Sequence, residues 1–334
     1  MTIIVTGGLG FIGTNFINSF IENNEETIIN IDYVTYASNQ DLAISKIDQK
    51  NNYEFIKANI SDKALVKQTF KKYNPRAIIN FAAESHVDRS INSPDVFIDS
   101  NIKGTFNLLK VSYDYWTCLN SKDKDNFRFI QISTDEVYGS LESDEMPSTE
   151  VSSYKPSSPY SASKASADHL VQAWHKTYSF PTIISNCTNN FGPYQHNEKL
   201  IPLIITNALN KNSLPIYGDG NQIRDWLYVK DHCNAINILL NKGVPGETYN
   251  IGSSNEIKNI DLVKNICSIL DVKVPLKSRT YSSLIKFVKD RPGHDTRYAL
   301  NSSKIKRLGW NVEESFESRL NSTIEWYIEK NIFK

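Results

Sequence analysis

Cysteine is scarce in this sequence, and its four cysteines show no pairing by spacing. Cys118, Cys187, Cys233 and Cys267 lie far apart and form no CxxC motif. This pattern argues against a disulfide framework and against the usual spacing of zinc ligands. We therefore expect free thiols in a reducing compartment, the cytoplasm, and no metal site.

Excess charge and long apolar runs are also missing. The chain has 37 Lys+Arg and 37 Asp+Glu, so its formal net charge is zero. A broad basic footprint for nucleic acid or an anionic membrane is thereby excluded, although a small anionic ligand is not. No apolar run approaches the ~20 residues needed to cross a bilayer. The start, MTIIVTGGLGFIG, also lacks the basic region of an export signal. We expect neither a nucleic-acid partner nor a membrane partner.

What the sequence does contain is an alternation of strand and helix patterns. Apolar β-type runs at residues 2–6, 27–32, 76–83, 126–134 and 180–187 alternate with helical spacing at 11–22, 63–72, 96–116 and 160–178. This order predicts an α/β fold with a doubly wound parallel sheet of the Rossmann type. With 334 residues and 40% hydrophobic content, the chain is long enough for about two domains.

The second half is less regular and is punctuated by proline. Helical patterns occur at residues 199–210, 231–241, 261–270 and 315–329. We predict a dinucleotide-binding domain over residues 1–185, to which the chain returns at about 221–243. Residues 186–334 are predicted to form mainly a smaller α/β substrate domain.

A glycine pattern separates the first strand from the first helix. In GGLGFIG, Gly7 permits a tight turn, Gly10 lets the backbone approach a pyrophosphate, and Gly13 lets the helix pack close to the strand. Asp32 ends the second strand, where a carboxylate binds the ribose hydroxyls of NAD and repels the 2′-phosphate of NADP. The alternative is that Asp32 only caps a turn.

A tyrosine and a lysine lie four residues apart in YSASK, on one face of a predicted helix. A cationic Lys164 beside the phenol of Tyr160 would lower the pKa of that phenol. A phenolate can accept a proton from an alcohol while hydride leaves the same carbon. A Tyr-x-x-x-Lys pair found alone is more often two exposed residues on one face of a helix, without a catalytic role.

Thr134, Asp135 and Glu136 follow one another at the carboxyl end of a buried strand. In a regular strand the two acids would face opposite ways, so both reach one pocket only if the chain leaves strand geometry there. Two carboxyls in a closed pocket repel each other, which raises one pKa and provides an acid. Acids in the first turn of a helix are the ordinary alternative.

Nine segments, in order along most of the chain, resemble the dTDP-glucose 4,6-dehydratases of the extended short-chain dehydrogenase/reductase superfamily. They are GGLGFIG, FAAESHVDRSI, STDEVYG, PYSASKA, NCTNNFGPYQ, KLIPL, LPIYGDGNQIRDWLYVKDH, GETYNIG and DRPGHDTRY. The Asp135-Glu136 pair distinguishes this family from sister epimerases, which usually carry small residues there.

The resemblance implies NAD as cofactor and a reaction without net redox change. Tyr160, with Thr134 and Lys164, would act at the C4 hydroxyl, Glu136 would remove the C5 proton, and Asp135 would donate to the C6 hydroxyl as water leaves. For the cofactor it implies contacts with Gly7, Gly10, Phe11, Ile12, Gly13, Asp32, Asn59, Ile60, Ala82, Tyr160 and Lys164. At Asn59 the family commonly has Asp.

For the nucleotide sugar, the resemblance implies contacts with Ser85, Thr134, Asn190, Lys199, Arg224, Asn255, Arg291 and His294. Arginine suits a diphosphate because the guanidinium binds two oxygens at once. A surface ion pair is the ordinary alternative for Arg224 and Arg291, and a hydrogen-bonded role for His86 and His294. Trp226 and Tyr228 are predicted to be core residues.

The superfamily also implies a homodimer through the helices at residues 96–116 and 160–178. Their apolar residues could equally face the sheet; these are Val96, Phe97, Phe106, Leu109, Val111, Leu170, Val171 and Trp174. Two further functions stay open: a dehydratase or epimerase acting on a UDP- or GDP-linked hexose, and a non-catalytic NAD-binding protein.

Overall fold

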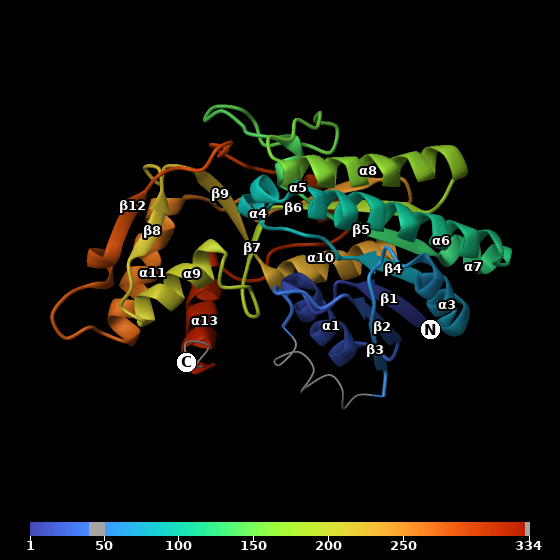
Figure 1. Ribbon diagram of the computed structural model, residues 1–334, viewed down its shortest axis with the longest axis horizontal. Helices are drawn as coiled ribbons and strands as arrows, with labels where there is room; N and C mark the ends of the chain where they lie inside the picture. Colours follow the sequence, from blue (N-terminus) through green and yellow to red (C-terminus); the bar gives the residue numbers. More distant parts are fainter. Residues whose placement is uncertain (40–50, 331–334) are drawn as a thin grey trace.

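The computed structural model describes residues 1–39 and 51–330 and contains a seven-stranded parallel sheet (Figure 1). Its order is β10-β6-β5-β4-β1-β2-β3. The strands are β1 (Thr2–Thr6), β2 (Thr27–Asp32), β3 (Tyr53–Lys57), β4 (Ala77–Asn80), β5 (Arg128–Thr134), β6 (Thr182–Cys187) and β10 (Thr248–Ile251). The predicted doubly wound parallel sheet is therefore confirmed. The strands β3 and β10 were not predicted.

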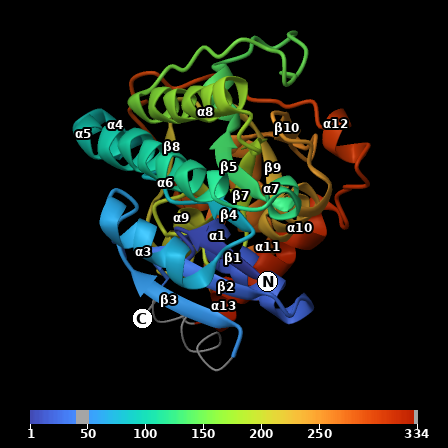
Figure 2. The same ribbon diagram turned by 90° about the vertical axis from the view of Figure 1, so that its right-hand side faces the viewer.

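Helices cover both faces of this sheet, as the nearly continuous apolar strands require. On one face lie α1 (Phe11–Asn23) and α10 (Val229–Lys242), which pack against each other. On the other lie α3 (Lys63–Tyr73), α6 (Thr105–Thr117) and α8 (Pro159–Tyr178) (Figure 2). Successive residues of β1 alternate between the two cores: Ile3 and Val5 join the first, and Ile4 joins the second.

The single helix predicted at residues 96–116 is wrong in detail. The chain forms α5 (Pro94–Phe97), a π-helical segment η1 (Ile98–Gly104) and then α6. Asn101 in η1 exchanges hydrogen bonds with the backbone of Glu84, at 2.8 and 3.0 Å. A π-turn adds one residue to a turn without breaking the helix, so apolar periodicity could not reveal it.

A smaller lobe lies beside the large sheet, at the left of Figure 1. It holds a three-stranded sheet of order β11-β9-β7 and a two-stranded one of β12 and β8. These strands are β7 (Asn189–Phe191), β8 (Leu214–Tyr217), β9 (Ile223–Tyr228), β11 (Glu256–Lys258) and β12 (Ile285–Val288). Its helices α9 (Leu200–Leu209), α11 (Asn259–Lys273) and α13 (Phe316–Glu329) share an apolar core of their own, which includes Trp226 and Tyr228.

The remaining elements are short: α4 (Val87–Asn92), α7 (Ser121–Asn126), η2 (Asp135–Tyr138), η3 (Tyr281–Leu284) and α12 (Ser303–Lys306). Within residues 1–39 and 51–330, no helix has the length and apolar character that a membrane crossing needs. All four cysteines are free thiols. The domain boundary near residue 186 stays a prediction, and residues 331–334 of the second predicted domain lie outside the described residues.

Candidate active site

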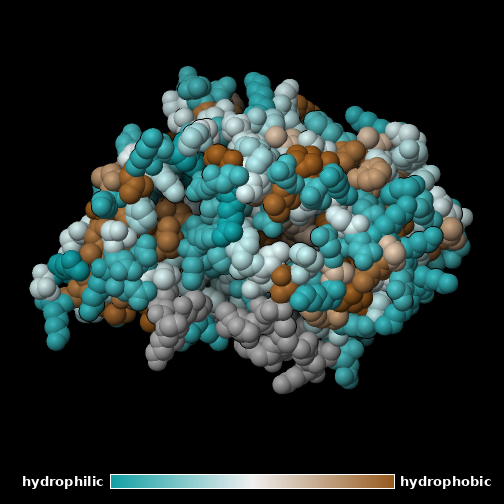
Figure 3. All heavy atoms as spheres, viewed as in Figure 1, coloured by the Kyte–Doolittle hydropathy of each residue, from teal (hydrophilic) through white to brown (hydrophobic). Residues whose placement is uncertain are grey.

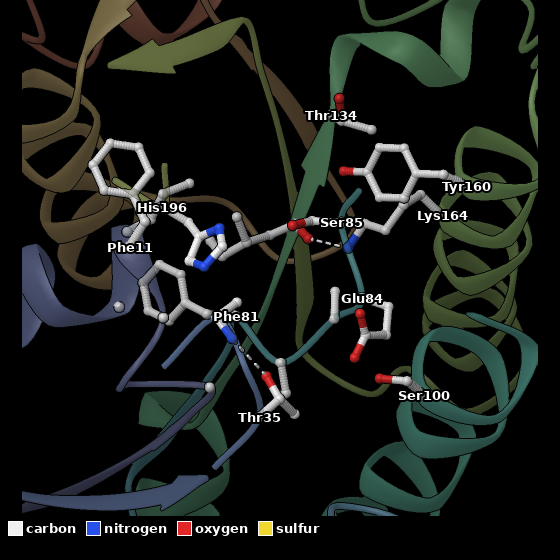
Figure 4. Close-up of a pocket in the computed structure, with 18 of the residues that line it drawn as sticks. Phe11, Thr35, Phe81, Glu84, Ser85, Ser100, Thr134, Tyr160, Lys164 and His196 are labelled. Carbon is white, nitrogen blue, oxygen red and sulfur yellow. Dashed lines mark hydrogen bonds between the residues drawn. The ribbon is translucent and has the colours of Figure 1, made fainter. Parts of the chain in front are cut away.

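A cavity of about 540 Å³ opens at the carboxyl ends of the central strands (Figure 4). Residues at or just beyond the ends of β1, β2, β4, β5 and β6 line it. Each residue predicted to contact the cofactor lines this cavity, and so does each predicted catalytic residue. Among the residues predicted for the nucleotide sugar alone, Ser85, Asn190 and Lys199 line it as well.

The glycine loop between β1 and α1 leaves no room for side chains. Gly7 has φ +68°, and a Cβ there would lie 2.6 Å from the backbone nitrogen of Ala82. A Cβ on Gly13 would lie 2.5 Å from the carbonyl oxygen of Gly7. Gly10 is the N-cap of α1 and caps it with no side chain, so N–H groups of the first turn are available to an anion. This cradle fits a dinucleotide pyrophosphate.

Asp32 combines the two roles weighed from the sequence. Its carboxylate accepts hydrogen bonds from the backbone N–H of Leu9 at 2.9 Å and of Val34 at 2.8 Å. It therefore caps this loop, and it also lines the cavity, where its remaining lone pairs can accept from hydroxyl groups. Burial raises the pKa of Asp32, against the lowering effect of these backbone bonds.

The two adjacent acids face one cavity because the chain leaves strand geometry at the end of β5. Thr134 is the last strand residue, and the 3₁₀-helix η2 begins at Asp135. The hydroxyl of Thr134 donates to Oδ1 of Asp135 at 3.1 Å and accepts from the backbone N–H of Glu136 at 3.3 Å. The predicted departure from strand geometry is confirmed.

The surroundings of the two carboxyls differ. Burial, followed by the nearby charge of Glu136, raises the pKa of Asp135 well above its ordinary value. Oδ2 of Asp135 is buried and has no hydrogen-bond partner within the described chain. Burial also raises the pKa of Glu136, but the charges of Lys199, Arg291 and Arg224 oppose this. Mutual repulsion, which we expected to be the main cause, is secondary to burial.

Tyr160 and Lys164 enter the cavity from the same face of α8 (Figure 4). The expectation that Lys164 lowers the pKa of the phenol is wrong for this structure. Burial, and then the charge of Glu136, raises the pKa of Tyr160, whereas a hydrogen bond with Thr134 lowers it. The ammonium of Lys164 donates instead to the carbonyl of Ile132 at 2.6 Å.

Cationic side chains of the smaller lobe gather on the side of Glu136. Arg224 is 5% exposed and donates to the backbone carbonyls of Ile223 and Asp295 at 2.7 and 2.8 Å. Its guanidinium has no carboxylate partner within 4.0 Å in the described chain. Arg291 pairs with Asp88 at 3.4 Å, so the ordinary ion-pair alternative holds for it in part. Burial with incomplete pairing suits Arg224 to an anionic ligand.

Among the remaining predicted substrate residues, Ser85 and Lys199 meet at the large cavity and Asn255 lies apart from it. Lys199 donates to the carbonyl of Ser85 at 2.8 Å. Nδ1 of His294 lies 2.7 Å from Oδ1 of Asp290, and Nε2 of His86 lies 3.5 Å from Oε2 of Glu198. Asn255 does not reach the large cavity and lines a separate one of about 270 Å³.

Sequence reasoning missed several buried partners of the site. His232 on α10 is completely buried and its Nδ1 lies 2.9 Å from the side-chain oxygen of Asn190. Asp168 on α8 accepts a 2.6 Å hydrogen bond from Ser133. The spacing of four residues from Lys164 could have revealed Asp168, whereas no local signal links His232 to Asn190.

A glycine cradle after β1 and a Tyr-x-x-x-Lys helix beside β5 define an extended short-chain dehydrogenase/reductase. The model of the family described as GDP-mannose 4,6 dehydratase matches residues 4–323. The chain is 52% identical to dTDP-glucose 4,6-dehydratase of Salmonella typhimurium, covering 98% of this chain and 93% of that protein. It is 51% identical to that of Haemophilus influenzae, covering 98% of each.

Solved structures of related enzymes have the same fold as this chain. Streptomyces venezuelae DesIV, a dTDP-glucose 4,6-dehydratase with NAD and TYD bound, is 39% identical with a TM-score of 0.89, over 99% of this chain and 98% of that one. UDP-glucose 4-epimerase of Thermotoga maritima, with UDP-glucose, is 26% identical with a TM-score of 0.86, over 99% of both chains. The chain belongs to the dTDP-glucose 4,6-dehydratase family.

Proposed function

We propose that this protein is an NAD-dependent hydro-lyase that converts dTDP-glucose to dTDP-4-keto-6-deoxy-glucose, a precursor of deoxysugars such as rhamnose. The observation that carries the proposal is the Asp135-Glu136 pair at the end of β5. Both acids line the cavity that Tyr160 and Lys164 line. An epimerase exchanges hydride at C4 and needs neither acid, whereas a dehydratase needs a base at C5 and an acid at C6.

The glycine cradle supports the cofactor assignment, because side chains at Gly7 and Gly13 would collide with the backbone. Asp32, with free acceptor positions toward the cavity, favours NAD over NADP. Asn59, Ile60 and Ala82 line the adjoining wall. When bound, NAD supplies a hydride acceptor that gives the hydride back later in the same turnover.

The proton transfers follow from the surroundings of each group. Asp135, whose pKa burial raises well above its ordinary value, is the carboxyl whose surroundings favour the protonated form, and it donates this proton to the departing C6 hydroxyl. Burial raises the pKa of Glu136 as well, but the charges of Lys199, Arg291 and Arg224 oppose this, so Glu136 is the acid of the pair that removes the C5 proton acidified by the 4-ketone. Tyr160 accepts the C4 hydroxyl proton, with Thr134 bonded to the same hydroxyl.

Tyr160 must therefore lose its proton when the site is filled, against the effect of burial. Lys164, one helical turn away on α8, supplies a buried cation for the resulting phenolate. In the substrate lobe, Arg224 and Arg291 bind the diphosphate, and Lys199 and Asn190 contact the sugar side of it. Ser85 and His294 complete the proposed substrate set around the diphosphate, whereas Asn255 would contact a ligand only from the separate cavity that it lines.

Purified protein incubated separately with dTDP-glucose, UDP-glucose and GDP-mannose tests this proposal. We expect a 4-keto-6-deoxy product from dTDP-glucose, seen by NMR or mass spectrometry. Product from only UDP- or GDP-linked hexose would favour the alternative dehydratase, and a C4 epimer would favour an epimerase. No product from any of the three would contradict the proposal and favour a non-catalytic NAD-binding protein.

We also propose a homodimer, located in the cytoplasm, that associates through α6 and α8. Among the helix residues considered for this role, Phe97, Leu109, Val111 and Val171 are buried in the core. Val96 and Phe106 are 50% and 45% exposed. In Figure 3 hydrophobic patches lie among hydrophilic residues over this face, and exposed apolar side chains of this kind support an interface there.

A further inference from the structure

We propose that Asp168 is a positioning residue for the reaction assigned above: its carboxylate balances the charge of Lys164 and holds α8 against the strand that ends in Thr134. The inference rests on the proposed function. It concerns a carboxyl group that does not line the cavity and that no step of the mechanism uses.

Asp168 joins three segments of the chain that converge on the site. It lies one turn after Lys164 on α8 and is completely buried. Its Oδ2 accepts from the hydroxyl of Ser133 on β5 at 2.6 Å and from that of Tyr154 at 3.2 Å. Tyr154 belongs to the segment between η2 and α8. One carboxylate thereby ties the helix of Tyr160 to the strand of Thr134.

The negative charge of Asp168 also acts on the ammonium group of Lys164. Burial lowers the pKa of Lys164, and Asp168 is the carboxylate whose charge opposes that lowering. Oδ1 of Asp168 is buried without a hydrogen-bond partner in the described chain, and the Lys164 ammonium, which has three N–H donors, gives one to Ile132. A buried ammonium without a counter-charge is costly. Within the described chain the two groups form no ion pair within 4.0 Å, so the carboxylate one helical turn away favours the charged form of Lys164 through its field rather than through contact.

The other groups around this carboxyl are neutral. Tyr154 and Tyr138 pack beside it, and burial raises the pKa of each phenol. Cys187 on β6 also acts on Lys164, and burial raises the pKa of its thiol to about 12. Burial raises the pKa of Asp168 itself to about 6, against the charge of Lys164. The carboxylate is therefore charged at neutral pH and is neutralised in mildly acidic solution.

The substitution Asp168→Asn removes the charge and keeps the shape. Without the carboxylate the pKa of Lys164 falls, so the alkaline limb of the kcat/KM profile should move down by about one pH unit, a tenfold loss on that limb. Below pH 6 the wild-type carboxyl is protonated too, so the two profiles should converge there. A merely structural residue would instead lower kcat/KM by one factor at every pH.

Two variants act as controls for this profile. Asp168→Glu keeps the charge and should return the alkaline limb toward its original pH. Tyr154→Phe removes one hydrogen bond to Oδ2 without removing the charge, so its limb should stay in place. If the alkaline limb of the kcat/KM profile does not shift in Asp168→Asn, the proposal is overturned.

A second measurement needs neither activity nor a folded Asp168 variant. The ¹⁵N signal of the Lys164 ammonium, assigned by its loss in Lys164→Met, should show an inflection near pH 6 in the wild-type protein. A flat titration between pH 5 and 7 would refute the charge coupling, even if no substrate were turned over. Failure of the dehydratase assay with the inflection present would contradict only the proposed function.

Discussion

At the scale of single residues, the site gives different surroundings to two carboxyls that are adjacent in the chain. Asp135 is 3% exposed and has an oxygen without a partner in the described chain. Glu136 faces the charges of Lys199, Arg291 and Arg224. These different surroundings support the roles proposed above, proton donor for Asp135 and proton acceptor for Glu136.

This arrangement predicts a pH-dependent gain in stability for Asp135→Asn. In the unfolded chain the carboxyl ionises near its ordinary pKa of 3.8, whereas burial raises this pKa in the folded protein. Between these two pKa values the folded state holds a proton that the unfolded state releases, so the free energy of unfolding falls as pH rises. Asparagine carries no such cost.

We therefore expect Asp135→Asn to melt roughly 1–3 °C above the parent at pH 7, with the difference vanishing below about pH 4. Turnover should fall by about 10²–10⁴-fold, because the C6 hydroxyl loses its acid. Thermal unfolding followed at both pH values checks the first point. Equal melting temperatures at pH 7 would show that folding does not raise the pKa of the parent carboxyl.

At the scale of elements, the loop from β1 to α1 depends on glycine for two separable reasons. A Cβ on Gly13 would lie 2.5 Å from the Gly7 carbonyl oxygen and 2.7 Å from Gly8 Cα. Both are backbone atoms that cannot yield without moving the loop. A Cβ on Gly10 would meet only the Gly7 carbonyl oxygen, at 3.2 Å. The fold therefore requires glycine at position 13, and binding of the ligand requires glycine at position 10.

Gly13→Ala should therefore lower the free energy of unfolding by about 1–3 kcal/mol and weaken NAD binding. Gly10→Ala should weaken NAD binding with a much smaller loss of stability, because its methyl group lies on the cavity side. Denaturant unfolding and NAD titration of both variants measure the two effects. Equal destabilisation by the two substitutions would contradict this separation.

Elements with a strong local pattern were predictable, and those defined by distant partners were not. The strands β1 and β2 are visible in the sequence as apolar runs, because both faces of the sheet are buried. The helix α1, which covers one of these faces, is visible by its apolar spacing. The short strand β10 joins the sheet only through β6, far away in the sequence. The cavity lining followed from motifs, whereas the raised pKa of Tyr160 depends on burial that no motif expresses.

At the scale of the whole molecule, one helical face is more apolar than a monomer requires. Val96, Ile98 and Phe106 are exposed on consecutive parts of α5, η1 and α6. Phe106 also contacts Trp174 of α8 edge to face, with ring centroids 5.8 Å apart. A second copy of the chain would cover this face.

We expect the wild-type protein to have the mass of a dimer in light scattering, and Phe106→Glu to shift it toward the monomer, since a buried charge opposes association. Val151→Glu is the matched control, because Val151 is 93% exposed in a loop outside these helices. A wild-type monomer, or a Phe106→Glu dimer as tight as the parent, would place the interface elsewhere or exclude it.

The return of the chain to the large sheet determines the order in which parts of the sheet can be completed during synthesis. The apolar face of α1 is covered by α10, and the edge of β6 is paired by β10, which ends at Ile251. During synthesis, which runs from the N-terminus, neither cover exists until residues 229–251 have emerged from the ribosome. The nucleotide cradle at the very beginning of the chain is thus among the last parts of the sheet to acquire its full support.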